Sequence, residues 1–290
     1  MTDAAIIGRV TAPEVHVMSF NIRRRLPSAR RGSPDRWSTR RPLVTRLLAA
    51  EQPTILGVQE ALADQVHVIA EGLGPAYRWV GMGRDPSGRG ERCPVFYDAD
   101  RLELIAWRQR ALSATPDLLG SRTRSWGNLT RRILVSAAFA DRSTGARIVA
   151  FNTHLDHLSW RSRLHSARFI VELASASQAA DPDAAVVVTG DFNANERSAV
   201  YRALTADGVL RDSWDAAAER ITPQWGTYHG YRRLRRGGPR IDFVFAGRGV
   251  DVARVAINAA RFDGLAASDH EPVQAVVRPP AAGDDQHEEG

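Results

Sequence analysis

The 290-residue sequence predicts an α/β protein, because apolar stripes typical of helices alternate along the chain with short apolar runs typical of strands. A hydrophobic content of 43% is enough for a substantial core. We find no internal repeat and no linker long enough to divide the chain. We therefore expect one domain over residues 14–278, with flexible termini at 1–13 and 279–290.

In the first half of the chain, two expected strands each end at a polar residue. The alternation in residues 15–20 predicts a strand that ends at Asn21, and residues 55–59 predict a strand that ends at Glu60. The remaining elements expected here are helices at 43–48 and 62–73, and strands at 77–82 and 94–97 around a glycine-rich loop at 83–90.

The strongest single signal is the run from Val186 to Val188, which is followed by Gly190, Asp191 and Asn193. Three valines without polar alternation predict a strand covered on both faces, and the glycine allows the backbone to turn as it leaves the sheet. Because residues two apart in an extended segment point the same way, the Asp and Asn side chains can address one small volume. Taken alone, the motif is better explained by an Asx turn before a helix. Its meaning depends on the rest of the chain.

Other polar residues have similar places in the second half of the chain. His154 follows an expected strand at 147–151, and Asp269 and His270 precede the last expected strand. Asp242 lies inside an apolar run, where a carboxylate is costly unless a partner holds it. The remaining elements expected here are strands at 133–139, 241–245 and 272–277, and a helix at 164–174.

The chain is basic, with a net charge of +6 and a pI near 10.3, which is typical of proteins that attract phosphate polymers. All 39 basic residues are arginines, and we attribute this first to a GC-rich coding sequence. The arginine-rich segment 22–40 follows Asn21 directly. We favour a solvated loop for it, and a phosphate-gripping arm at the site is the alternative. A P-loop is excluded because the chain contains no lysine.

The sequence gives no sign of export or of membrane insertion. No apolar run approaches the ~20 residues that cross a bilayer, and residues 1–13 lack the basic and apolar regions of a signal peptide. A single cysteine, Cys93, rules out an internal disulfide framework and a multi-cysteine zinc site. We therefore expect a cytoplasmic monomer without a membrane partner.

Eight polar residues fall in or beside strands of one expected sheet system, and together they favour hydrolysis of a phosphoester. They offer oxygen ligands for a divalent cation, a carboxylate to activate water, an amide to orient it, and histidines to stabilise charge on phosphorus. This set suits Mg²⁺ or Mn²⁺ better than Zn²⁺. The eight residues are Asn21, Glu60, His154, Asp191, Asn193, Asp242, Asp269 and His270.

On these residues the chain resembles the endonuclease/exonuclease/phosphatase superfamily, also called the deoxyribonuclease I-like fold, and its finer details are similar to a bacterial branch of metal-dependent hydrolases. The resemblance covers residues 15–277. It implies a four-layer sandwich of two packed mixed β-sheets flanked by helices, with the site where the loops of the sheets converge. The matching segments, in the family's order, are Ser19-Phe20-Asn21, Gly57-Val58-Gln59-Glu60, Asn152-Thr153-His154, Gly190-Asp191-Phe192-Asn193, Arg240-Ile241-Asp242 and Ser268-Asp269-His270.

The resemblance implies one group of residues for the metal and one for the attacking water. Glu60 would bind Mg²⁺ or Mn²⁺ with help from Asn21 and Asp269. Asp191 would position or deprotonate the water, and Asn193 would steady it against the phosphate.

The resemblance implies a second group that contacts the phosphate. His270 would stabilise the transition state, and Asp242 would hold its tautomer. His154 would contact the phosphate near the leaving group, and Glu91 would orient it. The further residues expected to bind substrate are Arg84, His157, Arg163 and His229.

Two other functions match parts of the sequence. A calcineurin-like metallophosphoesterase is set aside because its Asp-x-His and Gly-Asn-His segments do not occur. A non-catalytic nucleic-acid-binding module would explain the charge but not two histidines that each have a candidate carboxylate partner. We expect a phosphodiesterase or nuclease that uses metal-assisted in-line attack of water, since residues 23–25 with Trp126 and Trp160 could grip phosphates or stack bases. A phosphatase or phosphodiesterase of a small phosphorylated metabolite is the alternative.

Overall fold

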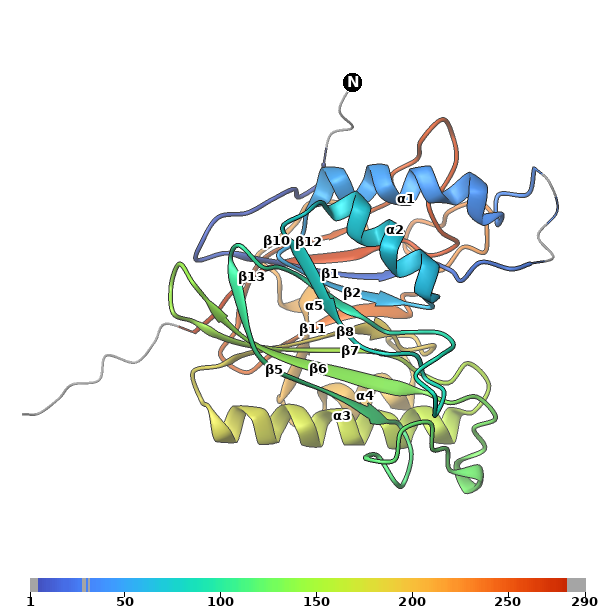
Figure 1. Ribbon diagram of the computed structural model, residues 1–290. Coiled ribbons are helices and arrows are strands. Elements are labelled where there is room, and N and C mark those ends of the chain that lie inside the picture. Colours follow the sequence, from blue (N-terminus) through green and yellow to red (C-terminus); the bar gives the residue numbers. More distant parts are fainter. Residues whose placement is uncertain (1–4, 28–29, 31, 281–290) are drawn as a thin grey trace, which may run out of the picture.

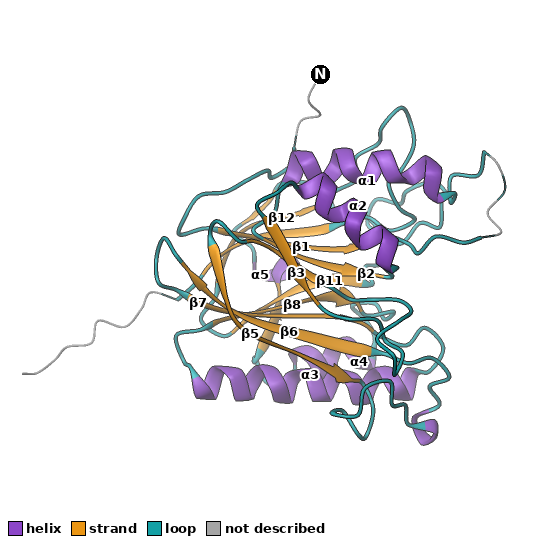
Figure 2. Ribbon diagram, in the orientation of Figure 1, coloured by secondary structure: helices purple, strands orange, loops and turns teal. Residues whose placement is uncertain are grey.

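The computed structural model describes residues 5–27, 30 and 32–280. Within them, two β-sheets lie face to face and helices cover their outer faces (Figure 1, Figure 2). Helices α1 (Trp37–Glu51) and α2 (Ala63–Leu73) cover the first sheet, and α3 (Trp160–Ala180) and α4 (Ala199–Thr205) cover the second. None of the helices in this part of the chain is long and apolar enough to span a membrane. The predicted four-layer sandwich is confirmed.

In the described residues, the first sheet has seven strands in the order β10-β12-β13-β1-β2-β4-β3. β1 runs parallel to β2 and antiparallel to β13, so that Asn21 pairs with Gln59 at the end of the neighbouring strand. The strands are β10 (Glu219–Arg220), β12 (Asp251–Ile257), β13 (Val273–Arg278), β1 (Val15–Asn21), β2 (Ile55–Gln59), β4 (Val95–Asp98) and β3 (Tyr77–Val80).

The second sheet has six strands in the same described ranges, in the order β5-β6-β7-β8-β11-β9. β8 runs parallel to β7 and antiparallel to β11, which places Asp191 directly between His154 and Asp242. The strands are β5 (Leu102–Ala111), β6 (Ile133–Asp141), β7 (Arg147–His154), β8 (Ala185–Asp191), β11 (Asp242–Gly247) and β9 (Leu210–Asp212), and a short helix α5 (Ser213–Ala216) follows β9.

Side chains of the central strands alternate between two apolar layers. In β1, Val17 packs between the sheets, whereas Met18 packs in the layer under α1 and α2. In β8, Val187 packs between the sheets, whereas Val188 packs in the layer with α3 and α4. Because both faces of these strands are covered, their sequences are continuous apolar runs.

A buried hydrogen-bond network joins the two sheets near the ends of their central strands. The Asn152 Oδ1 of β7 accepts from Gln59 Nε2 of β2 (2.7 Å) and from Thr189 Oγ1 of β8 (3.1 Å). The Asn152 Nδ2 donates to the carbonyls of Val58 (2.8 Å) and Pro94 (2.9 Å). Asn152 is 0% exposed, so each of its polar atoms has a protein partner in place of water.

Gly57 allows the sheets to approach this closely. A Cβ at this position would lie 2.0 Å from Thr189 Oγ1 and 2.7 Å from Asn152 Oδ1. Any larger residue would therefore push the two sheets apart at the network.

Four of the described strands, β5, β9, β10 and β12, are absent from the sequence-based expectations, and β9 and β10 have only three and two residues. The longer two, β5 and β12, each contain a bulge, between Leu104 and Ala106 in β5 and between Val252 and Arg254 in β12. Because a bulge interrupts the two-residue alternation of a strand, the periodicity of these segments does not reveal them.

The segments on either side of β1 also differ from expectation. The N–H groups of Ile6, Ile7 and Gly8 donate to the Glu51 carboxylate at 2.8 to 3.2 Å, so this part of residues 1–13 is anchored rather than loose. Helix α1 begins at residue 37, and the arginine-rich loop is therefore shorter than 22–40. Of the termini expected to be flexible, residues 1–4 and 281–290 lie outside the described part.

Replacing Asn152 with alanine should lower the free energy of unfolding by on the order of 3 kcal/mol, because it leaves buried donors and acceptors of both sheets without partners. Urea unfolding of the purified variant measures this. Asn195→Ala, which removes one acceptor for the Arg197 N–H, is the matched control and should cost less than about 1 kcal/mol. Equal costs for the two variants would show that the network does not hold the sheets together.

Candidate active site

A cavity of about 410 Å³ lies at the edge of the sandwich where β1, β2, β7 and β8 end. Carboxylates and bases share its lining. The acidic members include Glu60, Asp191 and Asp269, and the basic members include Arg84 and Arg132. Nine of the predicted site residues line this cavity, namely Glu60, Arg84, Glu91, His154, His157, Asp191, Asn193, Asp269 and His270.

Side chains from both sheets meet at the cavity. The Asn21 Nδ2, at the end of β1, donates to Asp191 Oδ2 of the second sheet (2.9 Å) and to Glu60 Oε1 (3.1 Å). Asn21, Asp191 and Asp242 are each 1% exposed. Their burial makes the charges here interact strongly, since little water screens them.

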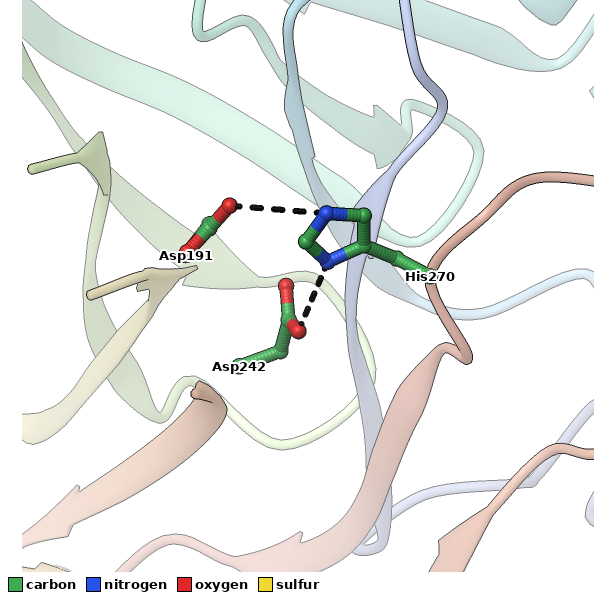
Figure 3. Close-up of side chains that lie close together, drawn as sticks. All are labelled: Asp191, Asp242 and His270. Carbon is green, nitrogen blue, oxygen red and sulfur yellow. Dashed lines mark hydrogen bonds and ion pairs between the residues drawn. The ribbon is translucent and has the colours of Figure 1, made fainter. Parts of the chain in front are cut away.

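His270 lies between two carboxylates that approach opposite nitrogens of its ring (Figure 3). Its Nδ1 is 2.9 Å from Asp242 Oδ2, and its Nε2 is 3.8 Å from Asp191 Oδ2. Burial by itself lowers the pKa of His270, but the charges of Asp242 and Asp191 raise this pKa well above its usual value. Burial, and then the charge of Asp242, raise the pKa of Asp191. This row can hold a cationic imidazole beside a carboxylate that is able to accept a proton.

The pKa of His154 is shifted in the opposite direction to that of His270. Burial, and then the positive charge of Arg132, lower its pKa well below the usual value, so the ring is neutral. The Asn193 Nδ2 donates to the Leu155 carbonyl (3.0 Å) and lies 2.9 Å from His154 Nε2. Because the carbonyl can only accept, the amide orientation is fixed, and His154 Nε2 is the acceptor.

The carboxylates of Glu60 and Asp269 face a gap that suits a divalent cation. The Arg23 guanidinium is 4.0 Å from Glu60 Oε2 and 3.7 Å from Asp269 Oδ2, which is too long for hydrogen bonds. Burial raises the pKa of Asp269, although the charges of His270 and Arg23 act to lower it. Glu60 and Asp269 thus present hard carboxylate oxygens to the cavity, which fit Mg²⁺ or Mn²⁺. The Asn21 amide presents its Nδ2 to Glu60, and its Oδ1 accepts from the Arg23 N–H (2.9 Å).

Asp191, Asp242 and His270 form another group whose candidate ligand atoms lie within 4.8 Å of one another. The two carboxylates approach opposite ring nitrogens, and Asp242 Oδ2 lies at hydrogen-bond distance (2.9 Å) from Nδ1 (Figure 3). We interpret this group as a hydrogen-bonded row rather than as the principal metal site.

Three residues around the cavity have a positive φ that is rare for residues other than glycine. They are Arg23 (56°), Glu60 (64°) and Asn193 (49°). Such conformations cost free energy, and they persist where the surrounding structure holds them, often at functional sites. The bends turn these side chains toward the cavity as the chain leaves β1, β2 and β8.

Glu91 does not contact His154 in the way that the resemblance implies. Its carboxylate accepts two hydrogen bonds from Arg84 (2.7 and 2.9 Å) and one from Arg24 (2.8 Å), and these strong charged donors occupy it. In the described residues, the polar groups near His154 Nε2 are Asn193 and Asp191. The described residues thus show no hydrogen bond between Glu91 and His154, and the role of Glu91 in orienting His154 stays a prediction.

Two of the expected substrate-binding residues lie away from the cavity. Arg163 donates to the Asp156 carbonyl (2.7 Å) and lines a neighbouring depression with Trp160. His229 is buried beside Glu271, with its Nε2 3.2 Å from the carboxylate, and Tyr228 lines the cavity instead. Consecutive residues of an extended segment point in opposite directions, so one of the two had to face away.

Neither tryptophan that was considered for base stacking lines the cavity. The Trp126 ring stacks on His165, with 4.5 Å between the ring centroids. Trp160 is 58% exposed beside Arg163.

Arg132 and Thr130 line the cavity but were not among the residues expected from the sequence. They come from the loop before β6. A charged residue just before a strand is common, so no pattern in the sequence singles out Arg132.

Comparisons with known proteins agree with this fold. A model of the endonuclease/exonuclease/phosphatase family matches residues 18–270. A family member of known structure from Bacteroides vulgatus is 32% identical, with a TM-score of 0.82 over 92% of this chain and 99% of that one. The structure of a mannosyl-6-phosphatase from Bacteroides thetaiotaomicron VPI-5482 is 28% identical, with a TM-score of 0.81 over 91% of this chain and 99% of that one.

An uncharacterized protein of Acanthamoeba polyphaga mimivirus is 26% identical over 174 residues, which is 56% of this chain and 61% of that protein. The match thus spans less than two thirds of this curated relative. The family model covers most of the chain and the solved structures share its architecture, which confirms the resemblance stated from the sequence. The chain belongs to the endonuclease/exonuclease/phosphatase family.

Proposed function

We propose that the protein is a phosphoesterase that requires Mg²⁺ or Mn²⁺ and hydrolyses its substrate by in-line attack of water. The observation that carries this proposal is the Asp242–His270–Asp191 row beside the carboxylates of Glu60 and Asp269 in one cavity. Asn21 connects the two groups, because its Nδ2 donates to both Asp191 and Glu60. Membership in a family of hydrolases that act on phosphoester bonds supports it.

The metal would be held by Glu60 and Asp269 with the help of Asn21, and when bound it would supply positive charge to the phosphate oxygens. Asp191, whose pKa is raised, would accept the proton of the attacking water. Asn193 would orient that water.

His270 would donate through its Nε2–H to a phosphate oxygen as negative charge develops there, and Asp242 would keep the proton on Nδ1. His154 would contact the phosphate on the leaving-group side. Arg84 and His157, which line the same cavity, would contact other parts of the substrate.

A small phosphoester is the substrate that we favour. The cavity holds about 410 Å³, which suits a metabolite, and one of the similar structures is that of a mannosyl-6-phosphatase. A nuclease or another phosphodiesterase is the second candidate, because Arg23 and Arg24 line the cavity and could hold flanking phosphates.

Purified protein should release phosphate or a leaving group from at least one phosphoester in Mg²⁺ or Mn²⁺, and EDTA should abolish this. The assay should include sugar phosphates, aryl phosphates and diesters, cyclic nucleotides, and single- and double-stranded nucleic acids. Asp242→Asn should lower kcat by on the order of 10²- to 10⁴-fold, because His270 loses its carboxylate partner. Asp117→Asn, at an exposed ion pair, is the matched control. Wild-type turnover by the Asp242 variant would refute the assigned role.

Glu60→Gln should weaken Mn²⁺ binding by more than about tenfold, because it removes a charged oxygen ligand from the proposed metal site. Isothermal titration calorimetry measures the affinity directly, and circular dichroism checks the fold. Glu71→Gln, at an exposed ion pair with Arg41, is the control that should bind as the wild type does. Unchanged affinity of the Glu60 variant would remove this residue from the metal site.

A further inference from the structure

Among the described residues, three arginines are buried, and one of them differs from the other two. Arg40 donates to backbone carbonyls, including that of Ile22 at 2.6 Å, and Arg240 donates to the Asp212 carboxylate at 2.7 Å. Arg132 is 4% exposed, and within the described part of the chain its side chain makes one hydrogen bond, from Nη2 to His157 Nδ1 (3.0 Å). Its buried Nε has no acceptor, which is also true of Arg240 Nε.

The carboxylate nearest to this region does not neutralise Arg132. Glu91 is occupied by Arg84 and Arg24. Asp156 is the other carboxylate whose charge acts on Arg132, and within the described residues neither carboxylate forms an ion pair with it. Burying a guanidinium that has no ion pair costs several kcal/mol. This cost is explained if a bound ligand supplies the anion.

Arg132 faces the substrate cavity beside His154. It also lines a small recess together with Glu60, Arg84, Glu91 and His154, and neither Asp191 nor His270 lines that recess. Its backbone is fixed, since the Arg132 carbonyl accepts from the Leu112 N–H (2.8 Å). The guanidinium is therefore held in place before any ligand arrives.

We propose that Arg132 binds a second anionic group of a small substrate, a phosphate or a carboxylate other than the phosphate that is hydrolysed. This inference rests on the proposed function, since it names the class of phosphoester that the same cavity takes. The planar guanidinium can present its free donors to two oxygens of one anion, which a lysine would not reproduce.

The direct test is binding without turnover. Calorimetry in EDTA should show that the wild-type protein binds glucose 1,6-bisphosphate more tightly than glucose 6-phosphate. Arg132→Gln should weaken binding of the bisphosphate by about ten- to a hundredfold, as expected for the loss of hydrogen bonds to a charged group, and it should leave binding of the monophosphate nearly unchanged. Arg108→Gln, at an exposed ion pair with Asp117, should behave as the wild type.

Two binding results would overturn the inference. If Arg132→Gln weakens both ligands equally, Arg132 binds the phosphate that they share. If the wild-type protein shows no preference for the bisphosphate, no second anion is recognised. Neither result depends on hydrolysis, so a protein that binds as expected but hydrolyses nothing in Mg²⁺ would contradict the proposed function and leave this inference standing.

Stability gives an independent readout. If Arg132 is retained for a ligand, Arg132→Gln should leave the thermal midpoint in EDTA unchanged or raise it, because an uncompensated buried charge is removed. Arg40→Gln, which removes hydrogen bonds to backbone carbonyls, should lower the midpoint clearly. A comparable loss for the Arg132 variant would assign Arg132 a structural role and overturn the proposal.

Discussion

The hydrogen bonds of Asn152 are the interaction on which the rest of the molecule depends. They join β7 and β8 of one sheet to β2 of the other, in a core where no water can replace a lost partner. The site draws Asn21 and Glu60 from the first sheet and Asp191 from the second, so a slip of one sheet would separate them. Gly57 makes this contact sterically possible, because any side chain at this position would clash with Thr189.

Positive and negative groups occupy different parts of the site. Glu60 and Asp269 contribute two carboxylates, and the Arg23 guanidinium lies 4.0 Å from the first and 3.7 Å from the second. Asp191 and Asp242 share one cationic imidazole, that of His270. The arginines around Glu91 carry the opposite excess. This arrangement suits a phosphoester, because the phosphate oxygens carry negative charge and the phosphorus atom between them is attacked by water.

The sequence predicts the positions of strand-end residues well but their partners poorly. Continuous apolar runs and a glycine before Asp191 are local signals, and the two-residue period of a strand fixes which residues leave it together. The bulges in β5 and β12 break that period, and these strands escape prediction. The pairing of Glu91 with Arg84, the burial of His229 against Glu271 and the lack of an ion pair at Arg132 result from three-dimensional packing, which spacing along the chain does not encode.

The central claim is that the metal and the proton-handling row occupy separate parts of one site. Anomalous diffraction from crystals soaked in Mn²⁺ tests it most directly, because the anomalous signal locates the ion without reference to activity. We predict a peak bounded by Glu60, Asp269 and Asn21, with His270 still hydrogen-bonded to Asp242. A principal peak coordinated by His270 together with Asp191 or Asp242, or no peak in the cavity at all, would contradict this account.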